Sequence, residues 1–503
     1  MLVGALLVRL VFFTGLLGWD DIEYREAASG LLRGDFLPRS MFWLRYGLIV
    51  PLAAAQACFG QNEYSAALVP LTYSLASLVL TYALGVLYGG VPLGLAASTF
   101  LAILPLDAIA ATDVHADLPA SFWMAFTVYC VKRGEDADSS EHSWFLAGGL
   151  ALGIAYLTKE PALAIVVVLL LRLFWLRRPW TNYGWLTAGF LLVLGLEFSW
   201  LGWISGNPLY RYSAVITDPH FSHLTLITPR SSWWMLDFPS MLLYPLSGYF
   251  GYFAASFYLV LAGLAWGIRR RDRAIIELTL WWLPLLLLLN FAPADPGFTR
   301  PLFFHFPRTL HPVLIPFALT AASWLLYGLG SWQRLRVGIL LGVMALSALG
   351  LWTTHFDYRI WAWAARRVTP VIRQYPLQTL VAADPTTMGL LRSLLPERRK
   401  SIIQYADLPE PIGGAAVLIL KDPLFLSTDN LARYAIPAAV LSPPPSWEKL
   451  AEFTRPRRHS LRRLLLEGIG VGTGRAGPTL TGSGLESVTL WRISSTPRQK
   501  PDR

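Results

Sequence analysis

Acidic residues gather at one point near the start of the sequence. The block 2–18 is apolar apart from one arginine, and it leads directly into Asp20, Asp21, Glu23 and Glu26. Charged residues at the depth of a membrane are costly, and they frequently serve a function. A carboxylate at this point could remove a proton from a substrate. It could also solvate the end of one helix and cap the next, and the sequence leaves both interpretations open.

A second acidic group lies between two later apolar blocks. In "TDVHADLP", Asp113, His115 and Asp117 are spaced at i, i+2 and i+4, and Asp117 opens the following block. A carboxylate at the start of a helix is stabilised by the helix dipole, which is one interpretation. The other is a divalent metal site, for Mg²⁺ or Mn²⁺, made of these three side chains.

Basic residues occur at comparable positions between apolar blocks. Lys159 stands in "YLTKEPAL", and Arg308 precedes His311 in "FPRTLHPV". A solvated turn and a snorkelling arginine are the simple explanations. If these cations share a face with the carboxylates, the set suits a transfer with a phosphate leaving group. A carboxylate would deprotonate the acceptor, and the cations would hold the departing phosphate.

The composition indicates that most of the chain lies in a membrane. The 503 residues are 54% hydrophobic and 15% charged, whereas soluble domains carry roughly 25% charged residues. Apolar blocks of the length needed to cross a bilayer recur along the first two thirds. The sequence therefore predicts a polytopic α-helical membrane protein, with eleven spans at 2–18, 64–88, 92–111, 116–131, 144–158, 161–176, 184–204, 241–266, 275–291, 309–327 and 337–353.

The basic residues indicate the orientation of these spans. Clusters of Arg and Lys fall at alternate ends of successive spans, which marks that side as cytoplasmic and accounts for much of the net charge of +10 without a nucleic-acid partner. The acidic segment 19–62 then lies on the exoplasmic or periplasmic side of the plasma (inner) membrane. It contains two expected surface helices, one in "EYREAASGLLRGDF" and one at 41–60.

The sequence changes character after about residue 370. Short β-type runs, "LQTLVAAD", "AAVLILKD", "AAVLSP" and "SVTLWRIS", alternate with helical patterns such as "PTTMGLLRSLL". We expect a transmembrane domain at 1–354, a linker at 355–369 and an exoplasmic α/β domain at 370–503. The glycine-rich stretch 468–484 matches no phosphate-binding loop and is interpreted as a flexible loop.

Five motifs in the first two thirds carry a family resemblance. They are "WDDIEYREAASGLLRGDF", "RYGLIVPLAAAQACFGQNEYSAAL", "DVHADLPASFWMAFTVYCV", "GLALGIAYLTKEPALAIV" and "PRTLHPVLIPFALTAA". In this order they resemble membrane glycosyltransferases with the C-type fold (GT-C), of the protein O-mannosyltransferase and lipid A aminoarabinose transferase type (glycosyltransferase family 39). The resemblance covers roughly residues 1–330.

The resemblance implies roles for particular residues. Asp20 would be the catalytic carboxylate, Asp117 a second acidic residue of the site, and Lys159 and Arg308 the contacts to the donor phosphate. Glu160 departs from the family pattern, in which a glycine follows the lysine. Further substrate-site candidates are Asp21, Tyr24, Arg45, Tyr46, Asp113, His115 and His311.

The activity that the resemblance implies is sugar transfer at the membrane surface. A polyprenyl-phosphate sugar would be the donor, a glycan, lipid or protein the acceptor, and the displacement inverting. The loop "TDPHFSH", with Asp218, His220 and His223, could cover the site. A lipid or solute transporter and a non-catalytic membrane scaffold are the alternatives. A transporter would be expected to show internal repeats and charges near the membrane midplane, whereas no repeat is evident and the acidic motifs gather at one face.

Overall fold

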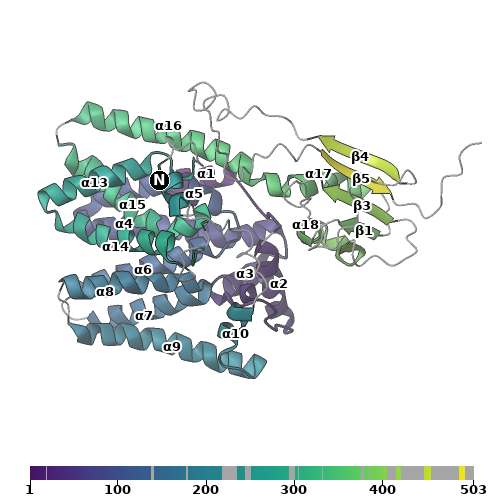
Figure 1. Cartoon of the computed structure of the whole chain (residues 1–503), viewed down its shortest axis with the longest axis horizontal. Helices are drawn as coiled ribbons and strands as arrows, with labels where there is room; N and C mark the ends of the chain where they lie inside the picture. The colour runs from purple at the N-terminus through teal and green to yellow at the C-terminus, as the bar shows by residue number, and fades with distance from the viewer. Residues whose placement is uncertain are drawn as a thin grey trace, which may run out of the picture. The chain divides into compact units, whose positions relative to one another are not determined.

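The structure is a computed structural model, and it divides the chain into two compact units. The membrane unit comprises Met1–Gly15 and Glu23–His355, and the C-terminal unit comprises Leu16–Ile22 and Phe356–Arg503 (Figure 1). The described residues are 1–18, 20–137, 141–176, 179–217, 235–243, 251–293, 301–303, 305–330, 332–374, 379–382, 385–404, 415–420, 447–454 and 487–492. The loop "TDPHFSH", the glycine-rich stretch and the run "AAVLSP" lie outside these residues.

The first half of the chain is helical, as its apolar periodicity predicts. Both expected surface helices are present, the second preceded by a short 3₁₀ turn and containing Pro51. The elements are α1 (Leu2–Val11), α2 (Asp20–Arg33), η1 (Met41–Leu44), α3 (Tyr46–Phe59), α4 (Glu63–Ala102), α5 (Pro105–Ala110), α6 (Asp117–Glu135), α7 (Glu141–Thr158), η2 (Glu160–Ala164), α8 (Ile165–Leu176) and α9 (Trp180–Ser205).

The predicted first span, 2–18, is wrong in length, because α1 ends at Val11. The chain then runs extended, and its backbone groups pair with a neighbouring segment instead of continuing the helix. The Thr14 N–H donates to the Thr112 hydroxyl at 2.9 Å, and the Gly15 N–H donates to the Thr112 carbonyl at 3.2 Å. These bonds satisfy groups that would otherwise be unpaired at membrane depth.

Two predicted spans, 64–88 and 92–111, form the single element α4 with a sharp reversal in it. Gly89 and Gly90 leave helical geometry, and Gly90 has a φ of +81°, which favours glycine. The two arms pack closely, since the Ser98 hydroxyl donates to the Leu78 carbonyl at 3.1 Å. The second arm ends at Ala102, and residues 105–110 form the separate short helix α5.

The second half of the membrane unit contains α10 (Tyr210–Thr217), α12 (Asp237–Leu242), η4 (Gly251–Phe253), α13 (Ser256–Arg270), α14 (Arg273–Phe291), η5 (Pro307–Leu310), α15 (His311–Ser323), η6 (Trp324–Gly328) and α16 (Gln333–Tyr358). The predicted span 241–266 is not one helix. Ala254 has a φ of +46° between η4 and α13, so the chain turns there and the long helix begins only at Ser256.

The described residues include five helical segments that are long and apolar enough to cross a membrane. They are α4, α9, α14, the segment Pro307–Gly328 and most of α16. Other predicted spans coincide with helices that are shorter or carry more charge, such as α6 and α7. The chain is an integral membrane protein, as its composition predicts.

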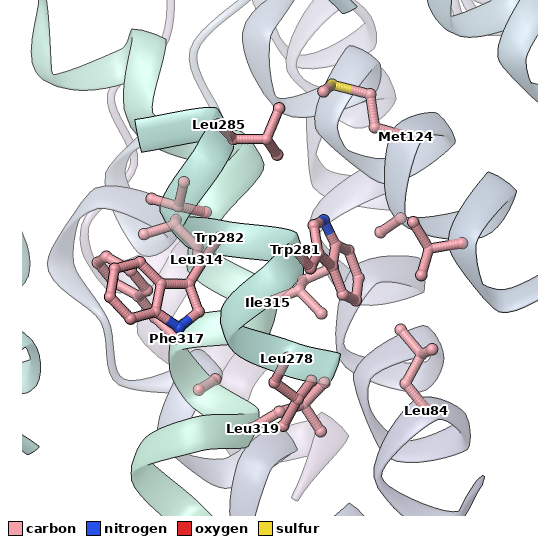
Figure 2. Close-up of a cluster of buried hydrophobic side chains, with 14 of the residues drawn as sticks. Leu84, Met124, Leu278, Trp281, Trp282, Leu285, Leu314, Ile315, Phe317 and Leu319 are labelled. Carbon is pink, nitrogen blue, oxygen red and sulfur yellow. The ribbon is translucent and has the colours of Figure 1, made fainter. Parts of the chain in front are cut away.

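The core of the membrane unit is built around α14 and α15. Figure 2 shows Trp281 and Trp282 of α14 among side chains of α15, with Met124 of α6 and Leu84 of α4 nearby. The Trp282 and Phe317 rings meet edge to face, with centroids 5.4 Å apart. Because lipid tails are as apolar as these side chains, close van der Waals packing is what holds the helices together.

The C-terminal unit is a small α/β fold, as the sequence predicts. Its five-stranded sheet has the order β2-β1-β3-β5-β4, with β1, β2 and β3 parallel and β4 and β5 antiparallel. The strands β2 and β4 were not predicted. The elements are α17 (Ile360–Gln374), β1 (Thr379–Ala382), α18 (Pro385–Leu394), η7 (Pro396–Ser401), β2 (Ile402–Gln404), β3 (Ala415–Leu420), β4 (Glu448–Thr454) and β5 (Ser487–Arg492).

Candidate functional site

Three predicted site residues meet in the membrane unit, each at the end of a helical element. Asp117 is the first residue of α6, Lys159 is the residue before η2, and Arg308 lies in η5 just before α15. The Lys159 ammonium lies 2.5 Å from Asp117 Oδ1, and Arg308 Nε lies 3.6 Å from Asp117 Oδ2. We call Asp117, Lys159 and Arg308 the Lys159 cluster. The structure thus brings together residues that the sequence places far apart.

The packing of the core explains why these three positions coincide. Helix α15 lies against α6 and α14, and α7 lies against α6. The ends of α6, α7 and α15 therefore converge, and each end carries one charged side chain. Asp117 lies in the first turn of α6, where the helix dipole favours a carboxylate, and its side chain also faces two cations.

Two histidines hold Arg308 in place. One Arg308 terminal nitrogen lies 2.7 Å from His115 Nε2, and that same ring nitrogen lies 2.9 Å from Asp113 Oδ2. His311 Nδ1 donates to the Arg308 carbonyl at 2.9 Å. A carbonyl oxygen can only accept, so Nδ1 of this buried histidine carries its proton. Asp113, His115 and His311 therefore surround the cluster and orient Arg308.

Asp113, His115 and Asp117 do not gather into the metal site that was one of the two interpretations of their spacing. Among the residues that the structure describes, no three His, Cys, Asp or Glu side chains are grouped so as to hold a metal ion. Asp113 and His115 do contact each other, but the Asp117 carboxylate faces Lys159 and Arg308 instead. Cations in those positions compete with a metal for the same oxygen atoms, so these residues do not fit a Mg²⁺ or Mn²⁺ ion.

A cavity opens beside the Lys159 cluster. It is a small cavity of about 20 Å³, with Asp117 and Lys159 at its polar part. The rest of its lining comes from α6, η2, α14, η5 and α15 and is mainly apolar: Ala120, Met124, Pro161, Ala162, Ala164, Leu289, Thr309 and Pro312. The cavity therefore combines a charged head with apolar walls.

Positive charge predominates around Lys159. Burial lowers the pKa of its ammonium; Asp117 opposes this shift, while the like charges of Arg45 and Arg308 add to it. Three cations thus act on one another around Asp117. Such a concentration of cations in a partly buried site attracts an anion.

Arg45 and its neighbours form the wall beside Lys159. Arg45 is buried, donates to the Tyr24 hydroxyl, and lies over the Phe42 ring at 5.0 Å and the Tyr24 ring at 5.5 Å. Burial raises the pKa of Tyr46 to about 12, so that hydroxyl is neutral at physiological pH. Arg45 is thus held by Tyr24 and Phe42, whereas Tyr46 lies near Arg211 and Glu197 and is unsuited to act as a base.

The first acidic pair divides into two different environments. Asp21 is fully buried and accepts the Leu17 N–H at 2.9 Å and the Gly18 N–H at 3.1 Å, so its carboxylate closes the turn that leads into α2. Asp20 is the first residue of α2 and is half-buried. Asp21 thus stabilises the turn that precedes α2, and Asp20 is the more accessible carboxylate.

A second ion cluster next to Lys159 was missed in the sequence. Arg211 of α10 lies 2.5 Å from Glu160 Oε1 and 2.5 Å from Glu197 Oε1, and it also donates to the Leu44 carbonyl at 2.5 Å. This Arg211 cluster (Arg211, Glu160 and Glu197) joins α9, α10, η1 and η2. It explains the departure of Glu160 from the family pattern. Glu197, a carboxylate inside a predicted span, was the signal that could have found it.

Comparisons with known proteins identify a related family and a similar fold. Residues 51–203 match the family model of dolichyl-phosphate-mannose-protein mannosyltransferases. The matched region contains Asp117 and Lys159, while Asp20 and Arg308 lie outside it. No curated protein matches the sequence significantly.

The fold is similar to that of solved membrane proteins. ArnT from Cupriavidus metallidurans in the apo state is 16% identical with a TM-score of 0.59, and the match covers 99% of this chain and 98% of that chain. The same protein bound to undecaprenyl phosphate matches with 16% identity, a TM-score of 0.58 and the same coverage. The Archaeoglobus fulgidus oligosaccharyltransferase tethered to an acceptor peptide with the NVT sequon is 13% identical, with a TM-score of 0.50 over 80% of this chain and 63% of that chain. The resemblance to C-type membrane glycosyltransferases that the motifs indicate is confirmed, and the fold is theirs.

Proposed function

We propose that this protein is a membrane glycosyltransferase that moves a sugar from a polyprenyl-phosphate donor to an acceptor. The observation that carries the proposal is the Lys159 cluster at the head of an apolar cavity. The likeness to ArnT, which has been solved with undecaprenyl phosphate bound, supports the class of donor. The acceptor is a hydroxyl or amine of a glycan, a lipid or a protein.

The donor phosphate would bind at the polar head of the cavity. Lys159 and Arg308 supply the positive charge, and an Arg side chain can offer two parallel N–H donors to phosphate oxygens. Asp117 keeps both cations in position before the donor arrives, because it contacts each of them. The polyprenyl chain would lie along the apolar lining between α6, α14 and α15.

In the proposed reaction Asp20 accepts the proton of the acceptor hydroxyl or amine. The freed oxygen or nitrogen lone pair forms a bond to the anomeric carbon of the sugar, and the bond from that carbon to the phosphate oxygen breaks with its electron pair. The polyprenyl phosphate that leaves carries the added negative charge. Lys159 and Arg308 stabilise this charge as it develops, which is the main way in which a fixed site lowers such a barrier.

The sidedness of the site belongs to the same proposal. Lys132, Arg133, Arg269 and Arg270 lie at the ends of α6 and α13, and Asp117 lies at the opposite end of α6. By the positive-inside rule the Lys159 cluster then faces the exoplasmic or periplasmic side of the plasma (inner) membrane. We propose that the domain 370–503, which follows the linker 355–369, is also exoplasmic or periplasmic.

The test uses purified full-length protein and an Asp20→Asn variant. Each is incubated with a panel of polyprenyl-phosphate sugars and candidate acceptors, and mass spectrometry follows donor consumption and release of polyprenyl phosphate. We expect turnover by the wild type with one donor sugar, and loss of turnover in Asp20→Asn with the fold and the membrane abundance unchanged.

Each result has a distinct meaning. Absence of both binding and turnover with every donor would contradict the proposal and favour a transporter or scaffold. Full activity of Asp20→Asn would remove Asp20 from the chemistry while leaving the transferase function in place. Loss of the variant from the membrane would assign Asp20 a structural role.

A further inference from the structure

The seven residues Leu16–Ile22 fold with the C-terminal unit, although the chain on both sides of them belongs to the membrane unit. This segment contains Asp20 and Asp21. The proposed base therefore stands on a peptide that is packed against the α/β fold.

Specific contacts within the C-terminal unit hold the segment. An Arg366 terminal nitrogen on α17 donates to the Leu16 carbonyl at 3.3 Å. On α18, Gly389 lies directly against Ile22, and a Cβ added at Gly389 would lie 3.1 Å from Ile22 Cγ2. Leu16 and Leu17 are buried, and neither is part of the apolar core of the membrane unit. The segment is thus held at both ends, at Leu16 and at Ile22.

Further hydrogen bonds join described residues within the segment. Gly18 has a φ of +92°, and the Asp21 carboxylate bonds the N–H groups of Leu17 and Gly18. These bonds tie Asp21, the neighbour of Asp20, to the backbone of Leu17 and Gly18. Gly389 itself is unfavourable in the interior of a ten-residue helix, and its contact with Ile22 supplies a physical reason for its presence.

We infer that the C-terminal unit positions the carboxylate of Asp20, with Gly389 and Arg366 as positioning residues that act through Ile22 and Leu16. This inference rests on the proposed role of Asp20 as the base. Displacement of a reacting group by about 1 Å can reduce a rate by about 10²-fold. A change on α18 would then lower the rate of the chemical step while leaving the donor phosphate site intact.

The principal variant is Gly389→Leu in the full-length protein. Leucine is a much better helix former than glycine, so a harmful effect cannot come from a weaker α18. We expect the amide hydrogens of residues 16–22 to exchange about tenfold faster by mass spectrometry. We also expect kcat for the polyprenyl-phosphate sugar to fall about 10–100-fold, with the donor KM unchanged. Adding Ile22→Ala removes the obstructing side chain and should restore both readouts substantially.

A matched pair on α17 gives a second test that does not depend on Gly389. Arg366→Gln removes the bond to the Leu16 carbonyl, whereas Arg373→Gln makes the same change at a residue that contacts the Leu394 carbonyl and Glu397 instead. We expect faster exchange at residues 16–22 and lower kcat in Arg366→Gln only. Faster exchange in β1 and β3 would reveal that Gly389→Leu also unfolds the sheet. In that case the Arg366 and Arg373 variants decide whether the C-terminal unit holds residues 16–22.

The outcomes separate this inference from the proposed function. Unchanged exchange at residues 16–22 in both Gly389→Leu and Arg366→Gln overturns the inference, whatever the activity. Faster exchange with unchanged kcat overturns the positioning role. An inactive wild type, or a fully active Asp20→Asn variant, contradicts the proposed role of Asp20 itself, and the exchange data then still report whether the C-terminal unit holds the segment.

Discussion

Two ion clusters in the membrane unit use similar residues in opposite ways. In the Lys159 cluster, the Lys159 and Arg308 side chains are 19% and 24% exposed. The other cluster is separate from the Arg211 cluster: Arg172 of α8 lies 2.6 Å from Glu135 of α6 and 3.3 Å from Glu277 of α14. The Arg172 and Glu135 side chains are each 1% exposed. We call these three residues the Arg172 cluster. One cluster adjoins a cavity, and the other is closed.

The balance of charge differs as well. The Arg172 cluster has two carboxylates around one arginine, and Arg273 at the surface contributes a further cation at 3.2 Å from Glu277. The Lys159 cluster has two cations on one carboxylate, with Arg45 adding to the positive charge. A buried ion pair whose members satisfy one another is a structural feature, since breaking it leaves a charge unpaired. Partial exposure with an excess of one sign is what distinguishes a binding site.

The largest effect on activity is expected from Lys159→Met. Removal of one group that stabilises developing negative charge typically costs about 10²–10³-fold in rate. The donor KM should rise as well, because the phosphate loses a cation in the bound state, while acceptor dependence should change less. Steady-state kinetics over both substrates checks this. A variant that changes only the acceptor KM would contradict the phosphate-binding role.

Arg172→Met should have the largest effect on stability. It leaves Glu135 and Glu277 buried without their main cation, and breaking a buried ion pair typically costs about 3–5 kcal/mol. We expect a lower melting temperature of the protein in detergent and a lower abundance of the protein in the membranes of cells. The activity of each molecule that remains folded should be close to that of the wild type. A stable protein with reduced turnover would show that this cluster, too, takes part in catalysis.

Arg211→Gln should have an intermediate effect, on both the stability of the protein and its affinity for the donor. Glu160 and Glu197 lose their shared partner, and the turn that carries Lys159 loses an anchor. We expect a loss of stability of about 1–3 kcal/mol and a donor affinity about tenfold weaker. Glu160→Gln is the matched control, because Arg211 then keeps Glu197 and the Leu44 carbonyl. Equal effects of the two variants would contradict the anchoring role of Arg211.

The smallest expected effect is a shift in pH dependence. Because burial lowers the pKa of Lys159, the ammonium loses its proton at a lower pH than an ordinary lysine. Donor kcat/KM should therefore fall as the pH rises through this lowered pKa, below the usual value of 10.5. In Lys159→Arg the alkaline decrease should move upward, since arginine stays protonated. A profile identical in the two proteins would show that another group causes the decrease.

Local sequence patterns were reliable where the physical signal is local. Apolar blocks predicted most of the helices of the membrane unit, and short β-type runs predicted β1, β3 and β5. The prediction of 2–18 as one helix was wrong because Thr112, far away in sequence, offers backbone and hydroxyl partners to Thr14 and Gly15. The short strand β2 was missed for a similar reason, since it forms by pairing with β1.

The sequence by itself determined the membrane setting, the helical architecture, the α/β texture of the C-terminal region and the set of charged residues at the ends of apolar blocks. Composition and periodicity are properties of neighbouring residues, so they can be read along the chain. Only the tertiary structure decided which charges become partners. It paired Asp117 with Lys159 and Arg308 instead of with a metal, and it paired Glu160 with Arg211. It also packed Leu16–Ile22 with the C-terminal unit. Those choices depend on distances of a few ångströms between distant segments, because the energy of an ion pair or a close packing contact falls steeply with separation.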